Sequence, residues 1–240
     1  MRRILVINPN TSESVSARLQ ARLSGTNGVE VHTVTARFGA PYIACEASYA
    51  VAGHAVLDAW ARARTRAAYD GVLIACFGDP GLFALRELCA LPVTGLAEAA
   101  FARAAQRGRF AVATGGAAWG PMLHRLAVAL GQAHALTRIE TVESSGIALA
   151  SDPQAAQRVL GAACTRIVRD TDARSIIIGG AGLAGLAQAM QPDVPLPLLD
   201  SVDEGMAHIL SGAVAAGGGH KPGFVWQGVG AELSAWGAAA

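Results

Sequence analysis

The sequence predicts an α/β fold of two pseudo-symmetric lobes, each with a parallel sheet covered by helices. Short apolar runs alternate with alanine-rich segments of helical pattern, which is typical of parallel strands joined by helices. The order of these elements also repeats. Asn8 precedes Cys76 by almost the same number of positions as Thr114 precedes Gly180, and all four positions close apolar runs. We therefore expect an active site in the cleft between the lobes, where strand ends face each other.

The elements follow from apolar runs bounded by turn signals and from helical periodicity. Strands are expected over 3–8, 29–34, 71–76, 92–95, 109–114, 139–143, 174–179 and 195–199. Helices are expected over 11–25, 47–68, 79–89, 97–107, 117–131, 152–170, 183–189 and 201–216. The first lobe would comprise residues 1–95 with about 201–240, and the second residues 96–200. We expect the less regular tail from residue 217 to cover one lobe or to form a subunit contact.

Composition argues against several functional classes. The chain has 240 residues, of which 52% are hydrophobic, but no apolar run is long enough to suggest a membrane span. The formal net charge is +1 and no basic run is interleaved with aromatic residues, so nucleic acid is a poor partner. The four cysteines form no CxxC pair, and no secretory signal is visible, which predicts reduced thiols in a cytoplasmic protein. Cys89 and Cys164 fall in helical patterns and are expected to fill small apolar spaces.

The loop after the first strand contains Asn10, Thr11 and Ser12. Asn10 suits the cap of the next helix, and a capped helix is the plain interpretation. The N-terminus of a helix also offers free backbone N–H groups to an anionic or carbonyl-rich ligand, and these side chains add donors. The run 114–116 holds the related position in the second lobe. Both loops are therefore candidate ligand contacts.

Cys76 closes the third strand, in the run Ala75-Cys76-Phe77-Gly78-Asp79-Pro80-Gly81. Asp79 can cap the helix that follows, and Pro80 suits its first turn. The thiol would then lie near the positive end of a helix dipole, which favours the thiolate, although the charge of Asp79 opposes this effect. A buried structural cysteine is the alternative.

Gly180 stands where a second cysteine would be expected from the repeat. The run from Gly180 to Gly185 matches GxGxxG, and Asp200 ends the next strand about 20 positions later, as in dinucleotide-binding proteins. However, the match lies in the second half of a repeat whose first half carries Cys76. Glycines would also let a substrate approach the backbone closely. We favour this second interpretation and expect no cofactor. The six scattered histidines show no HxxxH or HExxH spacing, and no metal site is expected.

Several stretches together resemble the aspartate/glutamate/hydantoin racemase superfamily, and most closely its hydantoin and allantoin racemase branch. The matching stretches are Ile7-Asn8-Pro9-Asn10-Thr11-Ser12, Pro41-Tyr42-Ile43, Ala75-Cys76-Phe77-Gly78-Asp79-Pro80-Gly81, Pro92-Val93-Thr94-Gly95-Leu96-Ala97-Glu98-Ala99 and Ile178-Gly179-Gly180-Ala181-Gly182. The resemblance implies two pseudo-symmetric lobes and cofactor-free proton transfer at a carbon next to a carbonyl. It also implies that Cys76 is one of two catalytic cysteines.

Gly180 departs from this pattern, because the racemases carry a cysteine there. Two-base racemisation needs a proton acceptor on one face of the carbon and a donor on the other, and a glycine supplies no proton. The chain could be an engineered or inactive racemase variant, or another residue or a water could replace the second thiol. A single cysteine could also act on one face, as in the related arylmalonate decarboxylases, although their thiol matches position 180 rather than 76.

We predict a cofactor-independent isomerase in which Cys76 is the base or acid, acting on a small cyclic ureide such as a 5-substituted hydantoin or allantoin. The alternatives are a single-cysteine decarboxylase or isomerase, and a protein that only binds a ureide or small carboxylate. The residues expected around the substrate, besides Cys76 and position Gly180, are Asn10, Thr11, Ser12, Glu46, Phe77, Gly78, Asp79, Thr114, Gly115, Gly116, Ala181 and Gly182. Backbone N–H groups there could hold an enolate oxygen. We expect a cytoplasmic homo-oligomer without metal, nucleic acid or membrane partners.

Overall fold

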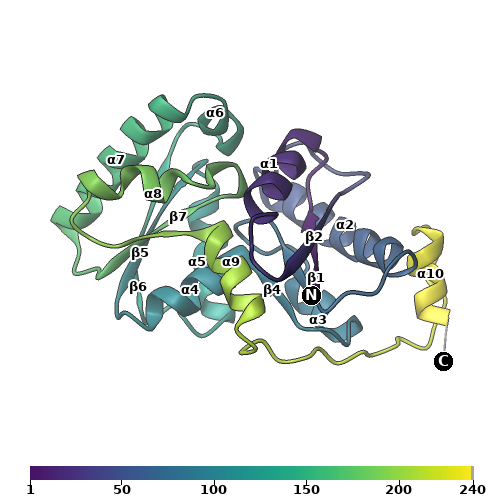
Figure 1. The fold of residues 1–240 in the computed structure, drawn as a ribbon. Coiled ribbons are helices and arrows are strands. Elements are labelled where there is room, and N and C mark those ends of the chain that lie inside the picture. The colour runs from purple at the N-terminus through teal and green to yellow at the C-terminus, as the bar shows by residue number, and fades with distance from the viewer. Residues whose placement is uncertain (239–240) are drawn as a thin grey trace.

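The computed structural model describes residues 1–238 and contains two parallel four-stranded sheets (Figure 1). Their strand orders are β2-β1-β3-β4 and β6-β5-β7-β8, so the same topology occurs twice. The strands of the first sheet are β1 Arg2–Asn8, β2 Val29–Thr35, β3 Gly71–Ile74 and β4 Val93–Gly95. Those of the second are β5 Phe110–Gly115, β6 Leu136–Val142, β7 Ser175–Gly179 and β8 Leu198–Asp200. The predicted fold class is confirmed.

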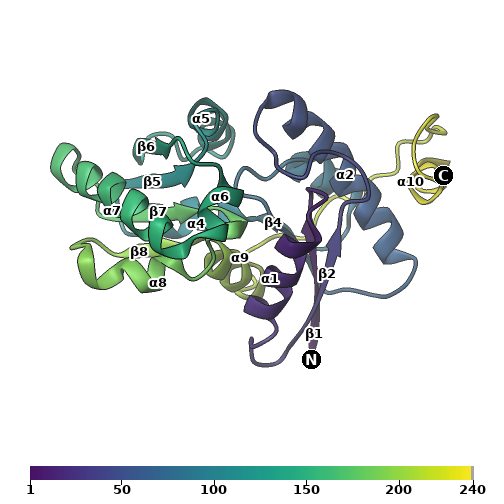
Figure 2. The ribbon, with the colours of Figure 1, turned by 90° about the horizontal axis from the view of Figure 1, so that it is seen from above.

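Helices flank both sheets, as Figure 2 shows from above. They are α1 Glu13–Leu23, α2 Glu46–Arg64, α3 Leu82–Leu88, α4 Leu96–Ala105, α5 Trp119–Ala129, α6 Gly146–Ser151, α7 Pro153–Asp170, α8 Leu186–Met190, α9 Ser201–Leu210 and α10 Ala231–Ala238. Short 3-10 turns lie at Ala181–Leu183 and Gln191–Asp193. In the second lobe α7 packs on β5 and β6, while α4 packs on β7. No helix among the described residues has the length and apolar character needed to cross a membrane.

The register of the two sheets places Cys76 and Gly180 at equivalent points. In the first sheet Ile7 of β1 pairs with Ile74 of β3. In the second sheet Ala113 of β5 pairs with Ile178 of β7. Cys76 and Gly180 each lie two residues beyond these partners, at the carboxyl ends of the corresponding strands. The repeat inferred from sequence spacing is therefore present in the fold.

Several element boundaries differ from the expected ones for identifiable reasons. Strand β8 begins at Leu198 rather than 195, because Pro195 and Pro197 have no N–H to donate to a sheet. Helix α9 ends at Leu210 rather than 216, shortly before Gly212 turns the chain with a φ of 76°. The helix expected from residue 79 begins only at Leu82. Helix α6 was not expected.

One hydrophobic core joins the two lobes. It includes Ile4 and Leu73 of the first sheet, Phe110 and Ile177 of the second, and Phe101 of α4, whose ring contacts those of Phe77 and Phe110. The tail crosses the first lobe and ends in α10, which packs on α2 (Figure 1). The tail thus covers the first lobe, which was one of the two roles expected for it. Residues 239–240, at the end of the predicted first lobe, lie outside the described residues.

Candidate active site

A cavity of about 280 Å³ lies between the lobes, where the carboxyl ends of the two sheets approach each other. Its volume is near the lower end of the range for small-molecule sites. The residues that line it are Asn10, Ser12, Ser14, Val15, Arg18, Tyr42, Ile43, Ala75, Cys76, Phe77, Thr114, Gly115, Trp119, Gly146, Ala150, Ser151, Gly179, Gly180, Ala181, Gly182 and Leu183. Both lobes contribute, and the lining contains one charged side chain, that of Arg18.

Cys76 lines this cavity from the loop between β3 and α3, and its side chain is half-buried. Burial raises the pKa of the Cys76 thiol, and the nearby charge of Asp79 raises it further. The expectation of a thiolate favoured by a helix dipole is therefore wrong. Desolvation and the charge of Asp79 both favour the protonated thiol as the resting form of Cys76.

Asp79 connects the Cys76 loop to the start of α4. It is the one non-glycine residue with a positive φ, 52°, among residues 1–238, and it is buried. Its carboxylate accepts hydrogen bonds from the backbone N–H groups of Ala97 (2.9 Å) and Glu98 (2.7 Å). Asp79 therefore caps α4 rather than α3, which corrects the expected cap. Burial raises the pKa of Asp79 to about 7, although the N–H groups of α4 act in the opposite direction.

Gly180 lines the same cavity as Cys76 but in a backbone conformation that favours glycine. Its φ is 145° and its ψ is 133°, and its N–H donates to Ser201 Oγ (3.1 Å). A Cβ built on Gly180 would lie 3.2 Å from Leu183 Cγ. On Gly179 a Cβ would lie 2.2 Å from the ring of Phe77, so close contact between the lobes requires glycine there.

In the loop after β1, hydrogen bonds to neighbouring residues fix the side chain of Asn10. Asn10 Oδ1 accepts from the N–H of Ser12 (2.9 Å) and from Asn8 Nδ2 (3.0 Å). Helix α1 starts at Glu13 with Ser12 as its N-cap, so the expectation that Asn10 caps this helix is wrong. The backbone N–H of Asn10 donates to Asn8 Oδ1 (3.3 Å), whereas its side-chain Nδ2 makes no hydrogen bond within residues 1–238 and remains a donor on the cavity wall.

Thr114 is the counterpart of Asn8 in the second lobe. Its buried hydroxyl donates to the carbonyl of Gly179 (2.7 Å), which ties the end of β5 to the end of β7. Because its proton is engaged, the Thr114 oxygen faces a ligand only as an acceptor.

The structure brings most of the expected site residues together. On the cavity lining it places Asn10, Ser12, Cys76, Phe77, Thr114, Gly115, Gly180, Ala181 and Gly182. Away from the lining it places Thr11, Glu46, Gly78, Asp79 and Gly116. Glu46 is exposed and paired with Arg125 of α5 (Oε2 to Nη2, 3.0 Å).

Other lining residues were not expected from the sequence. Arg18 follows Ser14 by one helical turn on α1, a spacing that could have placed both on one face. Tyr42 lies in a matched stretch, and its hydroxyl accepts from the N–H of Gly146 (3.2 Å). Ala150 belongs to α6, which has no strong helical signal in the sequence. Within the described part of the chain, no three His, Cys, Asp or Glu side chains gather as a metal site would require.

The chain has two equivalent α/β lobes and a cavity between them that contains one thiol. This architecture is that of an α/β enzyme with its active site between the lobes. The chain belongs to the Asp/Glu/hydantoin racemase family, whose sequence profile matches residues 4–209. It is 30% identical over 218 residues to a hydantoin racemase of Paenarthrobacter aurescens, covering 90% of this chain and 92% of that protein. These matches confirm the predicted family and an enzyme of the isomerase class.

Solved structures agree with this assignment. An allantoin racemase from Klebsiella pneumoniae superposes with a TM-score of 0.82 and 31% identity, covering 88% of this chain and 87% of that one. An allantoin racemase from Pseudomonas fluorescens gives a TM-score of 0.83 and 25% identity, covering 87% and 89%. The predicted hydantoin and allantoin branch is thereby confirmed.

Proposed function

We propose that this protein moves a proton to and from the carbon next to a carbonyl of a small cyclic ureide, with Cys76 as the acid–base group. The observation that carries the proposal is the half-buried Cys76 thiol on a small cavity between equivalent strand ends. Similar proteins named as hydantoin and allantoin racemases support the substrate class. The proposed reaction uses no organic cofactor or metal.

In the proposed chemistry the thiol first loses its proton to solvent, and the Cys76 thiolate then takes the proton from the substrate carbon and leaves an enolate. The C–H bond breaks as the S–H bond forms. The thiol, after exchange of its proton with solvent, returns a proton to the same face of the carbon, and the S–H bond breaks as the new C–H bond forms. The raised pKa of Cys76 favours the protonated resting state. Enolate oxygens would be met by the side-chain Nδ2 of Asn10 and by the Ser12–Ser14 hydroxyl pair on the same wall. The two hydroxyls share one hydrogen bond (2.9 Å), which leaves one proton of the pair to donate.

In this proposal a thiol meets only one face of the substrate carbon. Gly180 has no side chain with which to reach the opposite face of the carbon, and Leu183 occupies the space next to it. Deuterium from heavy water should therefore enter the substrate with retention of configuration faster than the substrate racemises. The same observation favours a second candidate, decarboxylation of a malonate followed by protonation from the Cys76 side.

The test of this function is deuterium uptake by allantoin and 5-substituted hydantoins in heavy water. Cys76→Ala should lower the exchange rate by about 10²–10⁴-fold, the usual worth of a positioned proton-transfer group. Cys45→Ala, which removes an exposed thiol outside the cavity, is the matched control and should leave the rate unchanged. Exchange by a folded Cys76→Ala variant at the original rate would remove Cys76 from the chemistry.

Release of CO2 from aryl malonates distinguishes the second candidate. Decarboxylation without measurable exchange of any hydantoin or allantoin would favour the decarboxylase over the isomerase. Saturable binding of these ureides without exchange or CO2 release would indicate a binding protein.

A further inference from the structure

We propose that Arg18 selects substrates whose ring substituent carries a negative charge, so that it is a specificity-determining residue of the cavity. This inference rests on the proposed function, because it concerns the substrate of the same cavity. Arg18 projects from α1, on the wall that also carries Ser12 and Ser14. It lies one helical turn beyond Ser14, so the two side chains share a face of α1.

The charge of the cavity lining is one-sided. Arg18 is its one charged residue, and no Asp or Glu of residues 1–238 lines the cavity. The wall formed by α1 also includes the N-terminal end of this helix, where the peptide dipoles place partial positive charge. A negatively charged group in the cavity would therefore meet attraction from Arg18 and α1, and no repulsion from a lining carboxylate.

Arg18 is held at the cavity without losing its charge to a partner. Its Nη1 donates to the carbonyl of Ala150 on α6 (3.0 Å), which fixes the guanidinium between α1 and α6. No carboxylate within residues 1–238 forms an ion pair with it. Arg22, one turn further along α1, is different, because its Nε is bonded to Asp203 Oδ1 (2.9 Å). The remaining donors of Arg18 can therefore form a paired contact with a ligand carboxylate.

A purely structural role for Arg18 predicts a different result. If the bond to Ala150 only held α6 in place, removal of Arg18 would change the cavity for every substrate to the same extent. If Arg18 binds an anion, its removal would affect charged substrates and leave neutral ones of the same shape almost unchanged. The comparison therefore needs two ligands that differ in charge and not in size.

Two such probes are 5-(2-carboxyethyl)hydantoin and its amide, 5-(2-carbamoylethyl)hydantoin. The unmodified protein should favour the carboxylate in kcat/KM for deuterium exchange. Arg18→Ala should lower kcat/KM on the order of tenfold for the carboxylate, as expected for a charge-assisted contact at a solvent-accessible mouth, and less than about twofold for the amide. Arg18→Lys should recover part of the preference, since it keeps the charge without the planar fork.

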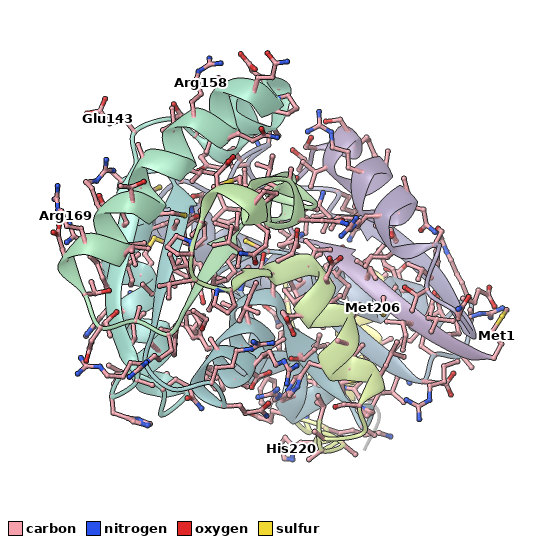
Figure 3. All side chains as sticks on the ribbon, turned by 60° about the vertical axis from the view of Figure 1, so that its left-hand side comes forward. Met1, Glu143, Arg158, Arg169, Met206 and His220 are labelled. Carbon is pink, nitrogen blue, oxygen red and sulfur yellow. The ribbon has the colours of Figure 1, made fainter. Side chains whose placement is uncertain are left out.

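Arg158→Ala is the matched control. Arg158 is exposed on α7 and projects away from the molecule in Figure 3, and it does not line the cavity. This variant should treat both probes as the unmodified protein does. Equal losses for the two probes in Arg18→Ala, or no preference for the carboxylate in the unmodified protein, would overturn the proposal.

Calorimetric binding of the same two probes separates this inference from the proposed function. Tighter binding of the carboxylate that is lost in Arg18→Ala supports the inference even if neither probe exchanges a proton, in which case the proposed reaction has failed. The opposite result would be that both probes exchange their proton for deuterium and that every variant binds the two probes with equal affinity. The proton-transfer function would then stand, and Arg18 would have no part in selectivity.

Discussion

At the scale of a single residue, Gly180 determines what can stand opposite Cys76. A cysteine at this position would have to adopt a φ near 145°, which L residues rarely do, and its Cβ would press on Leu183. We expect Gly180→Cys alone to lower the free energy of unfolding by about 1–3 kcal/mol. Its gain in racemisation should fall short of the 10²–10⁴-fold expected of a well-placed acid–base group.

Adding Leu183→Ala to Gly180→Cys removes the side chain nearest the new Cβ. The double variant should racemise a 5-substituted hydantoin faster than Gly180→Cys alone, as followed by optical rotation and deuterium uptake in one sample. Gly180→Ala with Leu183→Ala is the control, because it keeps the backbone strain without a thiol. A full gain in Gly180→Cys alone, at unchanged stability, would show that Leu183 does not obstruct this position.

The two central positions were predictable from sequence, but the chemistry of the thiol was not. Cys76 and Gly180 follow short apolar strands whose spacing repeats, so their equivalence is a property of the order of elements. The protonation state of Cys76 depends on burial and on the direction of Asp79, which turns to α4 rather than α3. These are tertiary features that a local capping pattern does not contain.

At the scale of elements, α6 and α10 show which segments the sequence leaves undefined. Helix α6 has six residues. Its start is fixed by Ser145, whose side chain accepts from the N–H of Ala148 (3.2 Å), and its position by hydrogen bonds to Tyr42 and Arg18 of the other lobe. So short a helix is stabilised by its tertiary contacts rather than by its own periodicity. The lining residues that it contributes were unpredictable for this reason.

Helix α10 illustrates how the tail stabilises the first lobe. Leu233 is buried against α2, and the ring of Trp236 lies edge-on to Trp60, with ring centroids 4.8 Å apart. Arg64 lies over the Trp236 ring, 3.8 Å from its centroid. The apolar contacts and the cation–π contact together attach the end of the chain to α2.

Leu233→Ala should lower the free energy of unfolding by about 2–4 kcal/mol, because it removes a buried side chain and leaves a cavity between α10 and α2. Denaturant unfolding measures this change, and Val225→Ala, an exposed position of the same tail, is the control. Deuterium exchange should stay within about twofold at temperatures where the variant is folded, since none of the residues that line the cavity belongs to α10. An exchange rate that falls with stability intact would instead connect the tail to the site.

At the scale of the whole molecule, the lobes are joined by a shared core and by groups that cross between them. Phe77 of the Cys76 loop packs on Gly179 of β7, and Arg18 of α1 donates to the carbonyl of Ala150 on α6 (3.0 Å). The doubled topology was predictable because strand and helix signals repeat in order. The contacts that close the lobes were not, because they join residues far apart in sequence whose approach depends on the final geometry.

Asp79 makes the stability of the molecule depend on pH, and the burial of its carboxyl group determines whether stability rises or falls with pH. Its pKa in the folded protein is about 7, above the ordinary value for an aspartate, so the folded state keeps a proton that the unfolded chain loses near pH 4. Folding therefore takes up a proton between about pH 4 and 7. The contribution of Asp79 to stability is fully present below this window and is lost as the pH rises through it.

The difference in stability between the unmodified protein and Asp79→Asn isolates this contribution. Asparagine tolerates the positive φ of this position and stays uncharged, so the variant lacks the titration. Relative to the variant, the unmodified protein should lose on the order of 4 kcal/mol in free energy of unfolding between pH 4 and 8, measured with denaturant at each pH. Asp172→Asn, at an exposed carboxylate, controls for loss of a surface charge. A difference that grows in favour of the unmodified protein with rising pH would mean that the N–H groups of Ala97 and Glu98 outweigh desolvation. Asp79 would then be a permanently charged anchor of the Cys76 loop at the start of α4.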